Sequence, residues 1–191
     1  IANWDGMDNM IAHKNPEIIY GVWQNGGLCR SDNGGKNINT GLADTIRSSE
    51  NGLWVTPIGM NPIHPATIYT GFTNLWKSTN YGKDWEKILD FDSKMFDTVN
   101  RASISIIKTA YNSQEHIAIY KDRQSSKIFG ELWLTNDFGT TWQKSSLDLP
   151  VDSLSLSSIE YHSENPDTMW VSFYTSNSAK NLYYTEDGGK S

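Results

Sequence analysis

The sequence of 191 residues has a single cysteine, Cys29, so an internal disulfide is excluded. That cysteine stands in a column of aromatic positions, and we interpret it as a small buried hydrophobe. No stretch approaches 18 consecutive apolar residues, so we expect no membrane insertion. The first residues do not form a signal peptide, which for an internal fragment says nothing about secretion.

Basic residues are also scarce. Sixteen Lys and Arg stand against 22 Asp and Glu, the net charge is −6, and no run of Lys or Arg occurs. Nucleic acids and anionic membranes bind basic patches, so the composition argues against both as partners. The four histidines show no metal-ligand spacing, and we expect neither a metal site nor a cofactor. No segment has a sustained period of 3.6 residues, which predicts almost no helix.

One short motif occurs four times: Ser or Thr, any residue, Asp or Asn, any residue, Gly. Its glycines are Gly35, Gly82, Gly139 and Gly189, so the steps are 47, 57 and 50 residues. An Asp or Asn side chain folds back onto nearby backbone N–H groups, and glycine adopts a positive φ without steric cost. The motif therefore predicts a tight turn, repeated at about the length of a four-stranded propeller blade.

The best copy is Thr135-Asn136-Asp137-Phe138-Gly139-Thr140-Thr141-Trp142, and the fourth copy ends before its tryptophan. The residues that we assign to the four turns are Ser31, Asn33, Gly35, Ser78, Asn80, Gly82, Trp85, Thr135, Asp137, Gly139, Trp142, Thr185, Asp187 and Gly189. Asn33 and Asn80 replace the aspartate but keep the carbonyl that forms the turn.

Other positions align once the glycines are aligned. A leucine stands three residues before each Ser or Thr, at Leu28, Leu75, Leu132 and Leu182. Further upstream, a turn leads to an apolar and aromatic pair: Ile19-Tyr20, Ile68-Tyr69, Ile119-Tyr120 and Met169-Trp170. Such pairs suit a half-buried strand. Between the repeats we expect a polar loop at 41–51, a strand at 53–56 ended by Pro57, and an exposed loop at 122–126.

The repeated motif resembles the Asp box, or BNR repeat, of sialidases, two-propeller xyloglucanases, sortilin-type receptors and many secreted bacterial proteins. The resemblance covers the whole chain and implies an all-β fold, a β-propeller built of four-stranded antiparallel blades. The units would span about 1–50, 51–98, 99–150 and 151–191, with the last blade incomplete. We therefore expect a fragment of a longer protein, packed against the remaining blades of its parent chain. The resemblance also implies a secreted or cell-surface location and places the box away from the ligand-binding face.

The innermost strands of a propeller line its central channel, and this geometry selects the candidate functional residues. Asp5 and Asp8 are candidate catalytic residues, because glycoside hydrolysis uses two carboxyl groups roughly 5 to 10 Å apart. The other interpretation is a polar turn before a strand. The candidate ligand-binding residues are Trp4, Trp23, Trp54, Arg101 and Glu160. The three tryptophans lie outside the repeat columns, which makes them candidates for stacking on sugars.

Sialidase activity is not expected, because the resemblance would require an arginine trio and an Arg-Ile-Pro motif. The chain has four arginines, and none precedes Ile-Pro.

Two hypotheses remain. The first is a non-catalytic propeller module that binds glycan or protein through its channel face. The second is part of a polysaccharide-degrading glycoside hydrolase, with some catalytic carboxylates outside this fragment. We favour the first, because the sequence has no recognisable catalytic pair.

Overall fold

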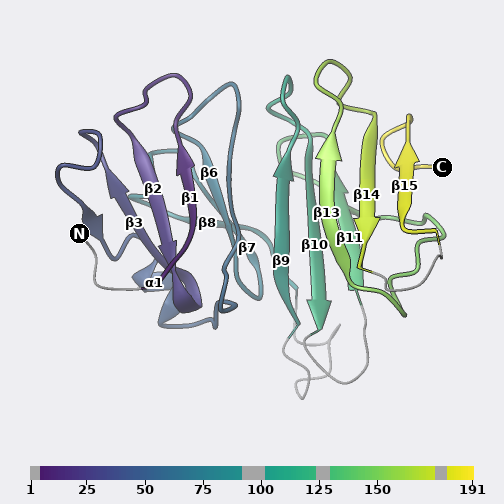
Figure 1. Cartoon of the computed structure of the whole chain (residues 1–191), viewed down its shortest axis with the longest axis horizontal. Helices are drawn as coiled ribbons and strands as arrows, with labels where there is room; N and C mark the ends of the chain where they lie inside the picture. Colours follow the sequence, from purple (N-terminus) through teal and green to yellow (C-terminus); the bar gives the residue numbers. More distant parts are fainter. Residues whose placement is uncertain (1–4, 92–101, 124–129, 175–179) are drawn as a thin grey trace.

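A computed structural model describes residues 5–91, 102–123, 130–174 and 180–191. Two candidate ligand residues, Trp4 and Arg101, lie outside these residues. The described chain forms four antiparallel sheets that follow one another in sequence and stand side by side (Figure 1). Each sheet is one blade of a β-propeller, which confirms the predicted fold class.

The strands of a blade are hydrogen-bonded in chain order. Blade 1 contains β1 (Gly6–Ile11), β2 (Ile19–Trp23), β3 (Gly27–Ser31) and β4 (Asn39–Thr40), with the 3-10 turn η1 (Gln24–Gly26) between β2 and β3. Blade 2 contains β5 (Ile58–Met60), β6 (Ile68–Gly71), β7 (Leu75–Ser78) and β8 (Glu86–Leu89). Blade 3 contains β9 (Ala102–Thr109), β10 (Ile117–Arg123), β11 (Gly130–Thr135) and β12 (Gln143–Lys144). Blade 4 has three strands within the described residues, β13 (Leu156–Tyr161), β14 (Met169–Phe173) and β15 (Leu182–Thr185).

Three local predictions were wrong. The segment 41–51 is not simply a polar loop, because α1 (Asp44–Arg47) forms there and buries Ile46 against the core of the first two blades. The strand expected at 53–56 is a turn, and β5 begins only after Pro57, whose ring permits no N–H in a ladder. The loop expected at 122–126 begins as strand, because β10 continues through Arg123 and pairs with both neighbours; residues 124–126 lie outside the described residues.

The structural equivalence of the strands also differs from the sequence alignment in blade 3. The first residue of each repeated turn pairs with Ile19, Ile68, Ile117 and Met169 in the four blades. Ile117-Ala118, and not Ile119-Tyr120, therefore occupies the position of Ile19-Tyr20. The displacement is two residues, so every side chain keeps its face of the sheet.

The hydrophobic core lies between the blades, in one cluster for each junction. Between blades 1 and 2, Tyr20 packs with Ile68 and Phe72. Between blades 2 and 3, Tyr69 packs with Ile104, Ile107, Ile117 and Ile119. Between blades 3 and 4, Tyr120 packs with Leu156, Ile159, Met169 and Val171. One face of each blade thus packs against the opposite face of the next, as in other propellers.

Candidate ligand-binding site

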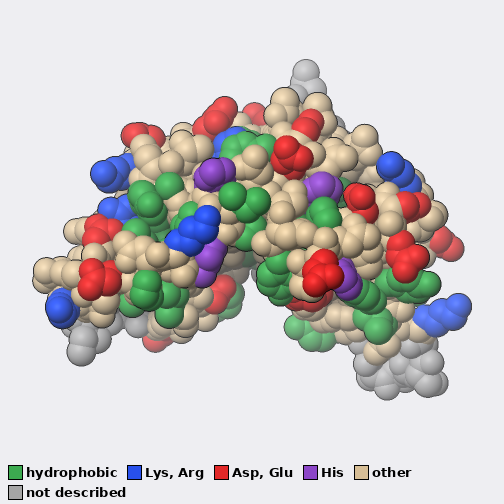
Figure 2. Space-filling model, turned by 90° about the horizontal axis from the view of Figure 1, so that it is seen from above, with side chains coloured by type: hydrophobic (Ala, Val, Ile, Leu, Met, Phe, Trp, Pro, Cys, Tyr) green, Lys and Arg blue, Asp and Glu red, His purple; other side chains and the backbone are tan. Residues whose placement is uncertain are grey.

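Each blade has two ends with different connections. At the turn end lie the four repeated turns, residues 31–38, 78–85, 135–142 and 185–191. At the connection end lie the segments that link the second strand to the third and one blade to the next, including η1 and α1. In Figure 1 the turn ends point upward and α1 lies below. Figure 2, seen from the turn end, shows the blades in an arc, with acidic side chains spread over this face.

The four turns share one hydrogen-bond pattern. In the third turn, the Thr135 hydroxyl accepts from the backbone N–H of Gly139 at 3.2 Å and donates to Asp137 Oδ1 at 2.7 Å. Asp137 Oδ1 in turn accepts from the Thr141 N–H at 2.8 Å. The motif glycines have φ between 82° and 88°. The residue before each glycine also has a positive φ, including Phe138 at 64°. Local hydrogen bonds and two left-handed residues therefore determine the turn.

Asparagine and aspartate build the same turn with different charge. Asn80 Oδ1 accepts from the Asp84 N–H at 2.9 Å, which is the bond that Asp137 makes with Thr141. The hydroxyl and the N–H of Thr141, with the hydroxyl of Thr135, lower the pKa of Asp137 to about 2. Hydrogen bonds from Ser191 and Thr185 lower the pKa of Asp187 in the same way. Both carboxylates accept hydrogen bonds within their own turns, so we assign them a structural role.

The two candidate catalytic carboxylates lie at the start of blade 1 and are exposed. Asp8 belongs to β1, pairs with Val22, and accepts from the Asn9 N–H at 2.8 Å. It lines a hollow of about 340 Å³ formed by β1, β2 and β3, together with Met7, Trp23 and Cys29. Asp5 precedes the strand. This hollow brings together one predicted carboxylate and one predicted tryptophan.

The predicted tryptophans Trp23 and Trp54 differ in exposure. Trp23 is 9% exposed, and its indole lies against Gly27 so closely that a Cβ there would be 1.9 Å from the ring. Trp54 is 57% exposed, and the adjacent Val55 is 48% exposed. Both lie in the turn closed by the Thr56 hydroxyl, which donates to the Leu53 carbonyl at 2.8 Å. Trp54 is therefore an aromatic ring held on a defined turn and open to solvent.

A polar hollow of about 540 Å³ lies on the same connection as Trp54. Its lining comprises Asn25 and six residues of the linker: Asp44, Arg47, Ser48, Glu50, Asn51 and Gly52. Arg47 is held in place, because its Nε donates to the Asn25 carbonyl at 3.1 Å and its Nη1 lies 3.1 Å from Asp44 Oδ1. The linker thus presents acceptors, a cation and an exposed indole at the connection end.

Glu160 lies on β13, at the junction with blade 3, far from Trp54 in sequence. Its Oε2 lies 2.9 Å from Lys108 Nζ, and its Oε1 accepts from the Tyr111 hydroxyl. Lys108 Nζ also donates to the Tyr111 hydroxyl oxygen at 3.3 Å. Burial by itself would lower the pKa of Lys108, but the hydrogen bonds of Glu160 and Tyr111 outweigh burial and raise it. Glu160 is therefore one member of a polar trio that the sequence did not reveal.

The sequence analysis also missed a buried lysine, Lys121, which is 2% exposed in β10. Its Nζ donates to the Thr73 carbonyl at 2.9 Å and lies 3.6 Å from the centre of the Phe91 ring. Burial lowers the pKa of Lys121 to about 8, although Glu131 and Glu50 act in the opposite direction. The sequence feature that could have revealed this lysine is its place directly after the apolar run from Ile117 to Tyr120.

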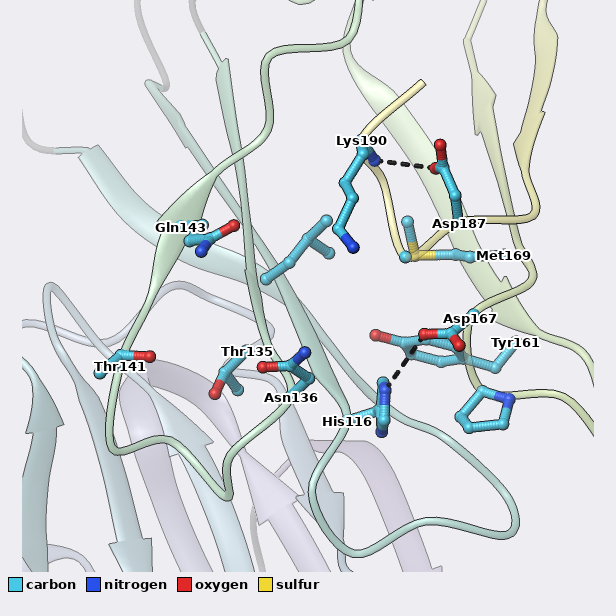
Figure 3. A pocket seen from close by; sticks show the side chains of 13 residues that line it. His116, Thr135, Asn136, Thr141, Gln143, Tyr161, Asp167, Met169, Asp187 and Lys190 are labelled. Carbon is cyan, nitrogen blue, oxygen red and sulfur yellow. Dashed lines mark hydrogen bonds and ion pairs between the residues drawn. The ribbon is translucent and has the colours of Figure 1, made fainter.

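A pocket of about 250 Å³ opens at the turn end between blades 3 and 4 (Figure 3). His116 and Asp167 face each other on one side, with His116 Nε2 3.5 Å from Asp167 Oδ1. Tyr161 lies beside them, and burial raises the pKa of its hydroxyl. Ser113 Oγ is 2.8 Å from His116 Nδ1, but it also accepts from the Glu115 N–H, so Ser113 stabilises its own turn.

In the part of the chain that the structure describes, there is neither a cluster of metal-ligand side chains nor a membrane-spanning helix. No group of three or more His, Cys, Asp or Glu side chains there could hold a metal ion. None of the helices in this part is long and apolar enough to cross a membrane.

Comparisons with known proteins give one family and several similar structures. The model of the Sortilin-Vps10 family (sortilin, neurotensin receptor 3) matches residues 73–191. An ancestral GH74 enzyme is similar over 98% of this chain and 23% of its own, with 17% identity and a TM-score of 0.68. The GH74 xyloglucanase from Xanthomonas campestris is similar over 94% of this chain and 28% of its own, with 16% identity and a TM-score of 0.69.

A third similar structure is YCF48 from Cyanidioschyzon merolae, with 12% identity and a TM-score of 0.53 over 94% of this chain and 55% of its own. No protein with a curated description matches the chain. The chain spans about a quarter of the length of the two GH74 enzymes. At these identities the likeness to the solved structures is one of fold.

Proposed function

The chain belongs to the Sortilin-Vps10 family, and we propose that it is a ligand-binding propeller module of a secreted or cell-surface protein. Its ligand is a protein or a glycan, bound at the connection end around Trp54. Propeller folds carry many unrelated activities, so this proposal rests on the site and not on the fold.

The observation that carries the proposal is the exposure of Trp54. A tryptophan side chain that is 57% exposed beside a half-exposed valine leaves a large apolar area in water. Tryptophan is enriched among the residues that dominate protein interfaces, and its flat face also stacks on sugar rings. The hydrogen bond that closes the turn fixes the backbone on which Trp54 stands, so less backbone entropy is lost when a ligand binds.

The hollow on the same connection as Trp54 supplies the polar part of such a site. Arg47 offers N–H donors, and Asp44 and Asn51 offer acceptors, within one cavity. A few oriented polar groups next to an apolar anchor are typical of binding sites for both glycans and peptides. The net charge of −6 favours a ligand that is neutral or basic.

The test is a screen of the fluorescently labelled chain against a glycan array and a displayed peptide library. We expect Trp54→Ala to weaken the best ligand by about tenfold or more and to leave the melting temperature unchanged. Tyr184→Ala is the matched control, because Tyr184 is 66% exposed on another blade. Equal loss in both variants, or full affinity in Trp54→Ala, would contradict the proposal.

The alternative function, part of a glycoside hydrolase, is favoured by one observation. Asp8 and Trp23 both line one hollow of about 340 Å³, so a carboxylate residue and an aromatic residue border the same cavity. The alternative predicts release of reducing ends from xyloglucan and loss of that release in Asp8→Asn. Binding of xyloglucan without any release, unchanged by Asp8→Asn, would support the module that only binds.

A further inference from the structure

Three polar side chains from two neighbouring blades meet near the turn end. Lys108 is the last residue but one of β9, Glu160 has the same place in β13, and Tyr111 lies in the loop between β9 and β10. β9 and β13 are the first strands of blades 3 and 4, and both run upward in Figure 1. First strands line the central channel of a propeller. The trio of Lys108, Tyr111 and Glu160 therefore lies beside the channel, close to its opening at the turn end.

Each member of the trio contacts both of the others. Lys108 Nζ donates to Glu160 Oε2 at 2.9 Å and to the Tyr111 hydroxyl oxygen at 3.3 Å. The Tyr111 hydroxyl donates to Glu160 Oε1, and Lys108 Nζ lies 5.0 Å from the centre of the Tyr111 ring. These contacts orient the three side chains before a ligand arrives, which reduces the side-chain entropy lost on binding.

The part of blade 3 that carries the trio is attached to both neighbouring blades. The hydroxyl of Thr109 donates to the Met60 carbonyl of blade 2 at 2.9 Å. The side-chain amide of Asn112, next to Tyr111, donates to the Glu164 carbonyl of blade 4. Tyr111 is 52% exposed although its blade has a neighbour on each side. Its exposure is therefore a property of the assembled blades.

The trio has hydrogen-bonding capacity that its contacts with the described residues leave unused. A lysine ammonium has three N–H donors, and Lys108 uses two of them within the trio. Each oxygen of a carboxylate has two acceptor positions, and each oxygen of Glu160 uses one. The Glu160 side chain is 47% exposed, so a ligand can reach it. One donor, two acceptors and the exposed ring of Tyr111 thus remain for a ligand.

The charges of the trio favour a neutral ligand. A cationic ligand would be repelled by Lys108 and an anionic ligand by Glu160, because the two charges lie 2.9 Å apart. Among neutral groups, two adjacent hydroxyls of a sugar ring match the two oxygens of one carboxylate. An oxygen of the same sugar can accept from a lysine, and the apolar C–H face of its ring packs on an aromatic side chain. A few oriented polar groups beside an aromatic ring are typical of small-ligand sites.

We propose that Lys108, Tyr111 and Glu160 form a binding site for one sugar ring of a neutral glycan. Two adjacent hydroxyls of the sugar donate to the two oxygens of Glu160, and a sugar oxygen accepts from Lys108. The ring of the sugar packs against Tyr111. This site lies at the turn end of blades 3 and 4, so it is separate from the proposed site around Trp54 at the connection end and does not depend on it.

The experiment uses two neutral oligosaccharides as probes, cellotetraose and mannotetraose. Saturation-transfer NMR and isothermal titration calorimetry measure their binding to the 191-residue chain. We expect at least one of them to bind saturably. Glu160→Gln should weaken that binding by about tenfold or more, because the amide keeps only one of the two acceptor oxygens. If neither oligosaccharide binds while circular dichroism shows an intact β fold, the proposal is wrong.

Further variants test the contribution of each group. Tyr111→Ala should weaken binding by about tenfold, and Tyr111→Phe should weaken it less because the ring remains. Asp90→Asn is the matched control, because the Asp90 carboxylate is also exposed and lies 3.3 Å from the ammonium of Lys87. It should leave binding unchanged. Full affinity in Glu160→Gln, or an equal loss in Asp90→Asn, would overturn the proposal.

Trp54→Ala separates this site from the proposed function. It should leave the affinity for the oligosaccharide unchanged, and Glu160→Gln should leave unchanged the affinity for a ligand that binds through Trp54. Oligosaccharide binding that is lost in Trp54→Ala and kept in Glu160→Gln would assign the sugar to the Trp54 site and overturn the proposal. If Glu160→Gln abolishes binding of a displayed peptide and neither oligosaccharide binds, the trio is a peptide site and the proposal is also wrong.

Discussion

Glu50 and Glu131 hold equivalent tryptophans in neighbouring blades, although they come from different parts of the fold. Glu50 lies in the linker before β5 and accepts from Trp76 Nε1 at 3.3 Å. Glu131 lies in β11 itself and accepts from Trp133 Nε1 at 3.0 Å. The two indoles stand at the same position relative to the turns that follow them. The same hydrogen bond between an indole N–H and a carboxylate is thus made by a linker residue in blade 2 and by a strand residue in blade 3.

Removal of the Glu131 carboxylate should destabilise the chain. The residue is 5% exposed, and its Oε1 also lies 2.6 Å from Lys144 Nζ. Glu131→Ala takes an acceptor from a half-buried indole N–H, which costs about 1–3 kcal/mol. Urea unfolding followed by tryptophan fluorescence measures the change. Glu131→Gln keeps an acceptor and should cost less, and an equal loss in the two variants would contradict this account.

Lys121 should give the chain an unusual dependence of stability on alkaline pH. Its pKa is lowered to about 8 in the folded chain by burial, against about 10.4 in an unfolded chain. Between these two values the unfolded chain binds more protons than the folded chain, so the free energy of unfolding rises with pH. Above about pH 10 buried tyrosines act in the opposite direction, because burial raises the pKa of Tyr69 to about 12.

In the window from pH 8 to about 10 the rise from Lys121 is opposed by the Cys29 thiol, because burial raises the pKa of that thiol and its titration lowers the free energy of unfolding as pH rises. We expect Lys121→Met to remove the rise in this window, measured by urea unfolding at steps of half a pH unit. Lys108→Met is the control, because the pKa of Lys108 is raised and its contribution is constant below pH 10. A rise that persists in Lys121→Met would refute the assignment.

Acid should weaken the third and fourth turns more than the first two. Hydrogen bonds lower the pKa of Asp137 to about 2 and also lower that of Asp187. A carboxyl group with a lowered pKa stabilises the folded chain above its unfolded pKa of about 3.9, and this stabilisation is lost as pH falls toward 2. Asp137→Asn should keep the turn, because Asn80 builds the same one, and should flatten the acid dependence. Thermal melts between pH 5 and 2 measure both effects, and an unchanged slope in Asp137→Asn would argue against this origin.

The turns and the fold class were predictable because local contacts determine them. Thr135 bonds to Gly139 four residues away, so the sequence spacing contains the whole geometry. The equivalence in blade 3 was not predictable in this way. Ile117-Ala118 and Ile119-Tyr120 both place apolar side chains on the same faces, and a shift of two residues changes no face. Only the register of the formed sheet distinguishes them.

The candidate site was harder to predict because its contacts are not local. Glu160 is bound by Lys108, which lies 52 residues away, and no nearby residue indicates this partner. The difference between Trp23 and Trp54 has a similar origin, since the ring of Trp23 is covered through its fit over Gly27 across the β2–β3 pair. Whether an aromatic ring stays exposed depends on what packs opposite it in the folded chain.

The fit of Tyr120 over Gly130 gives a further prediction about the junction of blades 3 and 4. Tyr120 is fully buried, and a Cβ on Gly130 would lie 1.7 Å from its hydroxyl oxygen. Gly130→Ala therefore forces the ring or the strand to move, and overpacking of this kind costs about 1–3 kcal/mol. Gly6→Ala is the matched control, because a Cβ there has no neighbour within 4 Å and should change stability by about 0.5 kcal/mol or less. Urea unfolding compares the two variants. Equal free energies of unfolding would show that the blade junction accommodates the added methyl group without loss of stability.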